Sequence, residues 1–202
     1  MSRIVFETSV NLVETFIMVE FITKYLGGSI KYGKARYGFF ITWILMFTEL
    51  CIINCISVME GVAVFIPVAV LFIYAVFCLP GNIYVKLWAA ILTEAIVVII
   101  AIATNLFVCA VIGYNPIDMI TVFNFIRIVS VIITKLLLFY ITRMILKVCY
   151  RNPLDRNVWF VFILMPVVSI VSLSALMLVA LDAEELSPMV LCGMGGTILA
   201  VL

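Results

Sequence analysis

Seven stretches of mostly apolar residues, separated by short polar segments, fill nearly the whole of this chain. They lie near residues 4–26, 37–57, 62–80, 87–113, 122–146, 158–181 and 188–202. A helix needs about 20 mostly apolar residues to cross the hydrocarbon core of a bilayer. The pattern therefore predicts an all-α fold, a polytopic transmembrane helical bundle with six complete spans and a short seventh one.

The composition leaves little material for a soluble domain. Of the 202 residues, 67% are apolar and 11% are charged, whereas roughly 25% of the residues of an average soluble domain are charged. We therefore expect one transmembrane helical domain over residues 1–202. The net charge of +1 argues against a nucleic-acid partner, because such binding depends on concentrated Lys and Arg side chains. Membrane lipid is the expected surrounding.

Basic and acidic residues alternate between successive connections. The first, third and fifth connections hold the basic residues Lys24, Lys31, Lys34, Arg36, Lys86, Arg143, Lys147, Arg151 and Arg156. The other connections hold Glu60, Asp118, Asp182, Glu184 and Glu185. Loops rich in Lys and Arg stay on the cytoplasmic side, which predicts an outer N-terminus and an inner C-terminus. The last stretch has only about 15 residues, fewer than a full crossing needs. We expect the chain to be part of a longer protein that continues into the cytoplasm; the alternative is a complete protein with a short last helix.

Seven ionisable side chains lie inside or at the edges of these stretches: Glu7, Glu14, Glu20, Glu49, Glu94, Arg127 and Lys135. Charges in hydrocarbon are costly, so each should face the bundle interior or pair with another. At about 1.5 Å rise per residue, matched depths on the first and fifth stretches predict the pairs Glu7 with Arg127, Glu14 with Lys135, and Glu20 with Arg143. Glu49 and Glu94 compete for Lys135. Such a charge network either fixes helix packing or takes part in signal response or ion movement.

Enzymatic chemistry finds little support in the residues. The chain has no histidine, so it lacks a Cys/His or Ser/His nucleophile pair and the usual imidazole metal ligands. Its six cysteines lie in apolar runs without C-x-x-C spacing and read as small buried hydrophobes. We expect no catalytic residue, no metal site and no cofactor in this chain.

Residues 127–147, RIVSVIITKLLLFYITRMILK, resemble a helix of the polytopic sensor region of Agr-type (accessory gene regulator) sensor histidine kinases, which belong to the GHKL ATPase family. Arg127, Lys135 and the LLLFY run after it carry most of the resemblance. Further segments occur in the order that such regions show: ETSVNLVETFIMVEFITKYLG near the start, GNIYVKLWAAILTE, WFVFILMPVVSIVSL, and GTILAVL at the end.

The resemblance implies a receptor in the bacterial cytoplasmic membrane that works in two-component signal transduction and quorum sensing. It implies detection of an extracellular signal, often a peptide, and transmission through the last helix to a cytoplasmic kinase module that this chain lacks. The longer parent would be an ATP-dependent protein histidine kinase and a homodimer. This chain alone has no phospho-accepting histidine, so we do not expect it to be an enzyme.

A ligand of such a receptor would enter the outer half of the bundle, where polar groups lie among apolar walls. The candidates for this pocket are Glu7, Asn54, Glu60, Tyr114, Asn115, Asp118, Asn124 and Arg127, with Phe6 and Phe107 at the same depth. For each of these residues, a role in ordinary helix packing is the simpler alternative. The chief rival function is a small solute-binding membrane subunit of a transporter, and a purely structural membrane partner is the third.

Overall fold

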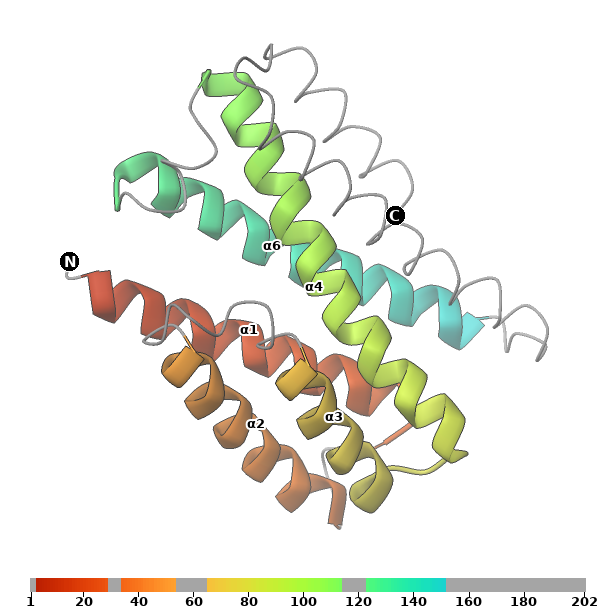
Figure 1. The fold of residues 1–202 in the computed structure, drawn as a ribbon. Helices are drawn as coiled ribbons and strands as arrows, with labels where there is room; N and C mark the ends of the chain where they lie inside the picture. Colours follow the sequence, from red (N-terminus) through yellow and green to blue (C-terminus); the bar gives the residue numbers. More distant parts are fainter. Residues whose placement is uncertain (1–2, 29–33, 54–64, 114–122, 152–202) are drawn as a thin grey trace. The chain divides into compact units, whose positions relative to one another are not determined.

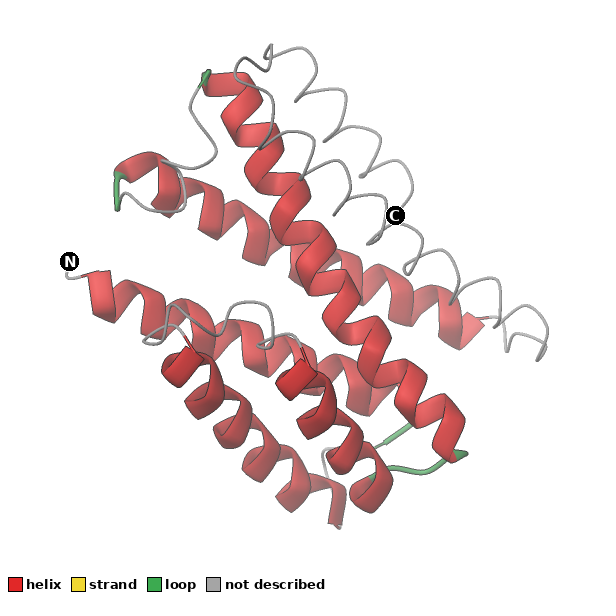
Figure 2. Cartoon of the chain, viewed as in Figure 1, coloured by secondary structure: helices red, strands yellow, loops and turns green. Residues whose placement is uncertain are grey.

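A computed structural model describes residues 3–28, 34–53, 65–113 and 123–151, and all regular structure in these ranges is helical (Figures 1 and 2). The helices are α1 (Arg3–Tyr25), α2 (Lys34–Ile53), α3 (Phe65–Cys78), α4 (Ile83–Ile112) and α6 (Phe125–Arg151). The predicted helical character is thus confirmed for this part of the chain. Each helix falls within a few residues of one of the first five apolar stretches.

The predicted count of seven membrane spans is wrong. Among the described helices only α4 and α6 are long and apolar enough to cross a membrane. Helix α1 carries Glu7, Glu14 and Glu20 along its length, and α3 has only 14 residues, fewer than the roughly 20 that a crossing needs. Helix α2 has Arg36 near its start and Glu49 near its end. The predicted stretches 158–181 and 188–202 lie outside the described residues.

The chain divides into two compact units. The first comprises Met1–Glu94 and Phe139–Leu154, and the second comprises Ala95–Leu138 and Asp155–Leu202. Helices α1, α2 and α3 therefore belong to the first unit, together with the start of α4 and the end of α6. The prediction of one domain over residues 1–202 stays a prediction.

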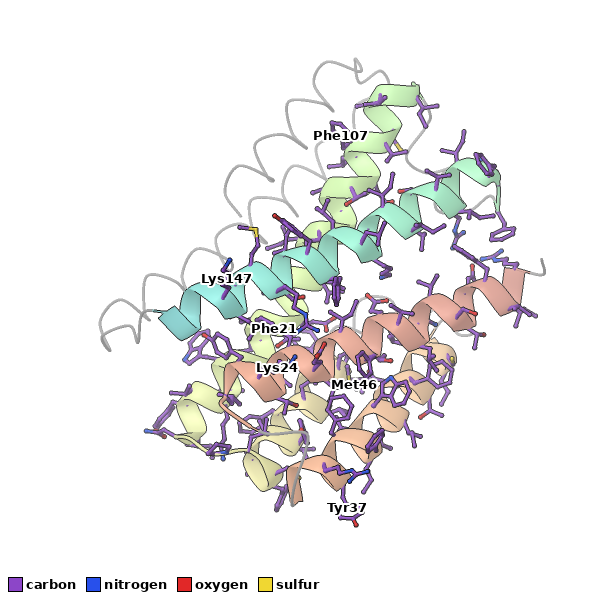
Figure 3. The ribbon with its side chains drawn as sticks, turned by 180° about the vertical axis from the view of Figure 1, so that it is seen from behind. Phe21, Lys24, Tyr37, Met46, Phe107 and Lys147 are labelled. Carbon is purple, nitrogen blue, oxygen red and sulfur yellow. The ribbon has the colours of Figure 1, made fainter. Side chains whose placement is uncertain are left out.

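In the first unit, α1 packs against α2 and α3, which also pack against each other (Figure 1). Phe21 on α1 and Met46 on α2, both labelled in Figure 3, are fully buried. Gly38 allows α2 to approach α3, because a Cβ atom there would collide with Cys78 Sγ and lie 3.0 Å from a ring carbon of Tyr74. The absence of a side chain at residue 38 thus sets the distance between these two helices.

The end of α1 is closed by two glycines. Gly27 has a φ of +71°, in the left-handed region that glycine adopts without steric cost. The amide of Gly28 donates to Thr23 O at 2.8 Å, and the amide of Gly27 donates to Lys24 O at 3.0 Å. This pair of bonds is a Schellman motif, which satisfies the last carbonyl groups of a helix. It places Lys24 in the last turn of α1.

The second unit contains the C-terminal part of α4 and the N-terminal part of α6. Ile99, Ala103, Leu106 and Ala110 are buried and recur every three or four residues, which places them on one face of α4. On another part of α4, Val108 and Cys109 pack against Ile126 of α6. The two helix segments are therefore held together by apolar contacts near the beginning of α6.

Candidate functional site

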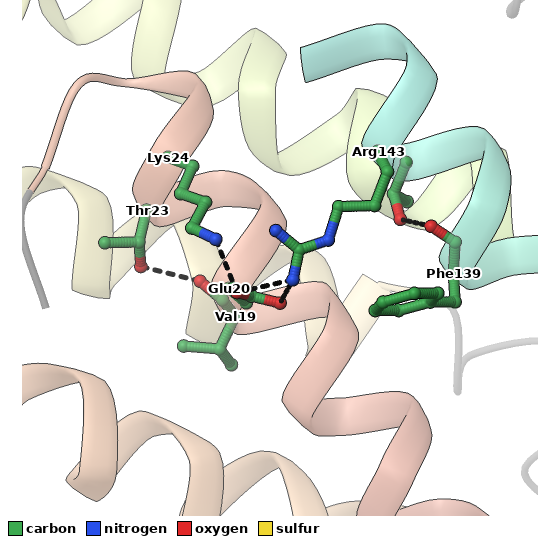
Figure 4. A network of polar contacts seen from close by, with 7 residues as sticks. Val19, Glu20, Thr23, Lys24, Phe139 and Arg143 are labelled. Atoms are coloured by element: carbon green, nitrogen blue, oxygen red, sulfur yellow. Dashed lines mark hydrogen bonds and ion pairs between the residues drawn. The ribbon is translucent and has the colours of Figure 1, made fainter. Parts of the chain in front are cut away.

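A group of charged side chains joins α1 to the end of α6 within the first unit (Figure 4). Lys24 Nζ lies 2.6 Å from Glu20 Oε1, and Arg143 Nη2 lies 3.0 Å from the same oxygen and 3.1 Å from Glu20 Oε2. We call Glu20, Lys24 and Arg143 the Glu20 cluster. One carboxylate thus accepts from two cations, one from its own helix and one from a helix more than a hundred residues further along the chain.

Local spacing explains how the cluster forms. Glu20 and Lys24 are four residues apart on α1, so their side chains lie on the same face of the helix. Arg143 also contacts a side chain of its own helix. Its guanidinium carbon lies 5.0 Å from the centre of the Phe139 ring, within the range of cation–π attraction. The guanidinium is therefore oriented by one helix and bound by the other.

The contact between Glu20 and Arg143 is partly shielded from water. The Glu20 side chain is only 13% exposed, and that of Arg143 is 43% exposed. Hydrogen bonds between ionised partners are shorter and stronger than neutral ones, and their attraction grows as water is excluded. The cluster consequently provides a specific link between α1 and α6.

A second polar link lies one turn away on α1 and reaches α3. The hydroxyl groups of Thr23 and Tyr74 are 2.9 Å apart, and Thr23 Oγ1 also donates to Val19 O at 2.6 Å. Tyr74 Oη therefore donates to Thr23 Oγ1, whose own proton is used by the carbonyl. Both side chains are buried, so the bond satisfies groups that have no access to water.

The second unit has a polar link of its own. Ser130 Oγ donates to Asn105 Oδ1 at 2.9 Å, which connects α6 to α4. Ser130 is completely buried. A buried hydroxyl of this kind costs free energy unless it is hydrogen-bonded, so this bond fixes how the two helices face each other.

Comparisons with known proteins find no relative. Neither the models of known protein families, nor curated proteins, nor solved structures match this chain. Its function is inferred from its own residues.

Three of the residues predicted for a ligand pocket lie in the described part of the chain. Glu7 Oε1 accepts from Arg3 Nε at 3.0 Å on the surface of α1. Asn124 precedes α6, and its Oδ1 accepts from the backbone amide of Arg127 at 2.8 Å, which makes Asn124 the N-cap of α6. The candidates Asn54, Glu60, Tyr114, Asn115 and Asp118 lie outside the described residues. The pocket therefore stays a prediction.

The structure brings together one of the three predicted charge pairs, Glu20 with Arg143. Glu7 and Glu14 belong to the first unit, whereas Arg127 and Lys135 belong to the second, and their pairings stay predictions. Two further carboxylates of the predicted network have distinct surroundings. Glu94 is buried on α4. Both carboxylate oxygens of Glu49 are buried without a hydrogen-bond partner among the described residues.

Several residues of these links were not predicted from the sequence. The charge pattern places Lys24 only in the first connection, although its spacing of four residues from Glu20 indicates an ion pair. Asn105, Ser130 and Tyr74 carry no charge and lie in apolar runs, where nothing in the sequence marks their partners. Within the described ranges no three of the residue types Cys, Asp and Glu gather to hold a metal ion.

Proposed function

We propose that this chain is a multi-pass protein of the bacterial cytoplasmic membrane. The support comes from α6, whose residues Phe125–Lys147 are apolar enough to cross a bilayer although only 22% of its most apolar segment is buried. The apolar core helix of a soluble protein would be mostly buried. Large exposed apolar side chains such as Phe125, Leu136 and Tyr140 fit a hydrocarbon environment, because patches of this kind are rare on soluble monomers.

We further propose that the chain is the signal-sensing region of an Agr-type sensor histidine kinase. The observation that carries this proposal is that α6, through Arg143, takes part in the Glu20 cluster. The segment that resembles these sensors, residues 127–147, lies in one continuous helix, Phe125–Arg151. Its inner part is bound through Arg143 to α1, so a displacement of α6 along its axis would change a charged contact.

In this proposal the signal is an extracellular peptide that binds near the start of α6. The N-cap Asn124 and Arg127 lie there, at the end opposite to Arg143. The response passes along α6 and then through the last helix of the chain to a kinase module outside residues 1–202, and the parent protein works as a homodimer. The phospho-accepting histidine would belong to that module, because these residues contain no histidine.

A chimeric receptor tests the proposal. Residues 1–202 are joined in frame to the cytoplasmic kinase module of an Agr-type sensor, and a transcriptional reporter is measured with and without culture supernatant of the source strain. We expect the supernatant to change reporter output, and Arg127→Ala to abolish the change. Arg36→Gln is the matched control, because it removes one exposed basic side chain from a different helix.

The same chimera separates the proposal from its rival. A chimera that is present in the membrane but does not respond, together with tight binding of a small metabolite by the purified chain, would favour a solute-binding transporter subunit. The coding sequence that follows the codon for Leu202 gives an independent test. We expect it to encode a dimerisation segment and an ATP-binding module, and a stop codon at that place would contradict the sensor proposal.

A further inference from the structure

The surface around the Glu20 cluster carries an excess of positive charge. Lys24 and Arg143 both contact Glu20 Oε1, and Lys147 follows Arg143 by four residues, on the same face of α6. Lys147 is exposed, and Figure 3 labels it on α6 together with Lys24 on α1. Lys24 and Arg143 thus share one carboxylate, and Lys147 adds a third cation beside them, so this group of four side chains carries a net charge of +2.

Apolar side chains border this basic group on α6. Phe139, Tyr140 and Met144 are all exposed, and Phe139 lies under the Arg143 guanidinium. The same part of α6 therefore offers cations and, beside them, exposed apolar side chains. A molecule with an anionic head and an apolar body matches both features, whereas a free anion uses only the first.

We infer that Lys24, Arg143 and Lys147 bind the phosphate of an anionic phospholipid, whose acyl chains lie along Phe139, Tyr140 and Met144. The inference rests on the proposed membrane location of the chain. Lys and Arg near the end of a membrane helix extend their charged groups to the headgroup level, and anionic lipids attract such residues. Arg143 suits this role because guanidinium groups bind phosphate oxygens with well-defined geometry.

The cluster allows Arg143 to exchange partners at little cost. When a phosphate draws Arg143 away from Glu20, the carboxylate keeps Lys24 at 2.6 Å, and the guanidinium keeps Phe139 beneath it. Neither charge is left isolated, which is the costly outcome for a partly buried pair. Glu20 therefore competes with the phospholipid for Arg143.

A lipid titration of the full chain tests this inference. The chain, purified in a neutral detergent, is titrated with dioctanoyl phosphatidylglycerol, with dioctanoyl phosphatidylcholine and with inorganic phosphate, and the midpoint of thermal unfolding is measured by circular dichroism. We expect only phosphatidylglycerol to raise the midpoint. A basic residue near an anionic membrane surface accounts for about fivefold in binding, so Lys147→Gln should raise the half-saturating lipid concentration about fivefold. Arg36→Gln, the matched control, should leave it nearly unchanged.

Glu20→Gln gives the clearest result, because it should strengthen lipid binding, whereas a structural defect would weaken it. Removal of the competing carboxylate should lower the half-saturating concentration of phosphatidylglycerol, even where the lipid-free protein unfolds at a lower temperature. Equal effects of phosphatidylglycerol and phosphatidylcholine, the same stabilisation by inorganic phosphate, or equal losses in Lys147→Gln and Arg36→Gln would each overturn the inference.

The membrane location is measured separately, by extraction of cell membranes at alkaline pH. A chain that resists extraction but does not prefer phosphatidylglycerol refutes the lipid site alone. Selective lipid binding by a chain whose chimera gives no reporter response supports the lipid site and contradicts only the sensor proposal.

Discussion

The ion pair between Glu20 and Arg143 can be measured by a double-mutant cycle in the detergent-solubilised chain. The single variants are Glu20→Gln and Arg143→Met, and the third variant combines them. Glutamine keeps the shape of the glutamate side chain, and methionine keeps an apolar stem over the Phe139 ring. The cycle isolates the coupling between the two charges, because other effects of each substitution cancel.

The burial of the two partners sets the expected magnitude. Exposed ion pairs contribute about 0.2–1 kcal/mol, and removal of one partner of a fully buried pair costs about 3–5 kcal/mol, because the other charge stays behind uncompensated. Glu20 is 13% exposed, Arg143 is 43% exposed, and Lys24 stays bound to Glu20 in the Arg143→Met variant. We therefore expect Arg143→Met to lower the unfolding free energy by about 1–2 kcal/mol, with a coupling energy of about 1 kcal/mol.

The assay is unfolding by sodium dodecyl sulfate, followed by circular dichroism, with the pair Arg3 and Glu7 as the internal control. That pair also has an N–O distance of 3.0 Å, but its side chains are 53% and 26% exposed and it lies within one helix. Pairs of this kind on helix surfaces contribute about 0.3–0.5 kcal/mol. If the coupling energy of Glu20 with Arg143 does not exceed that of Arg3 with Glu7, burial does not strengthen the pair and the reasoning is refuted.

Three further substitutions test the helix contacts by thermal unfolding. Gly38→Ala should destabilise the chain by about 1–3 kcal/mol, since the new methyl group would collide with Cys78 Sγ; an unchanged midpoint would contradict the close approach of α2 and α3. Asn124→Ala should cost about 1 kcal/mol through loss of the N-cap, while Asn124→Asp should keep most of the stability, and equal losses in both would contradict the capping role. Ser130→Ala should cost about 1–3 kcal/mol, because it leaves the Asn105 amide without its partner, and addition of Asn105→Leu should recover part of that loss; additive losses would exclude the bond.

The positions of the described helices follow closely from hydropathy. The stretch predicted at residues 4–26 corresponds to Arg3–Tyr25, and that at 122–146 corresponds to Phe125–Arg151. The ends follow from local chemistry that is visible in the sequence, such as Gly27 after α1 and Asn124 before α6. The number of membrane spans does not follow, because apolar length alone predicts a span even where carboxylates interrupt the stretch, as they do in α1.

Contacts between helices were predictable only where charge gave a signal. Glu20 and Arg143 have the same predicted depth and opposite charges, and the structure brings them together. The bond of Ser130 to Asn105 and that of Tyr74 to Thr23 join neutral groups, for which depth and charge give no preferred partner. The identity of such pairs depends on how the helices are rotated, and this rotation is decided by the packing of many apolar side chains.

The arrangement of the Glu20 cluster also distinguishes a reversible contact from a purely structural one. Separating an ion pair costs most when neither side chain has another partner, because separation then leaves two uncompensated charges. Here each partner has a second contact on its own helix: Lys24 for Glu20, and Phe139 for Arg143. Separation of α1 from α6 at this point therefore leaves Glu20 paired with Lys24, and it leaves the Arg143 guanidinium over the Phe139 ring with a side chain that is 43% exposed to solvent. A contact with this property suits a helix whose position is meant to change, and it allows either a signal at the start of α6 or an anionic headgroup at its end to shift the balance.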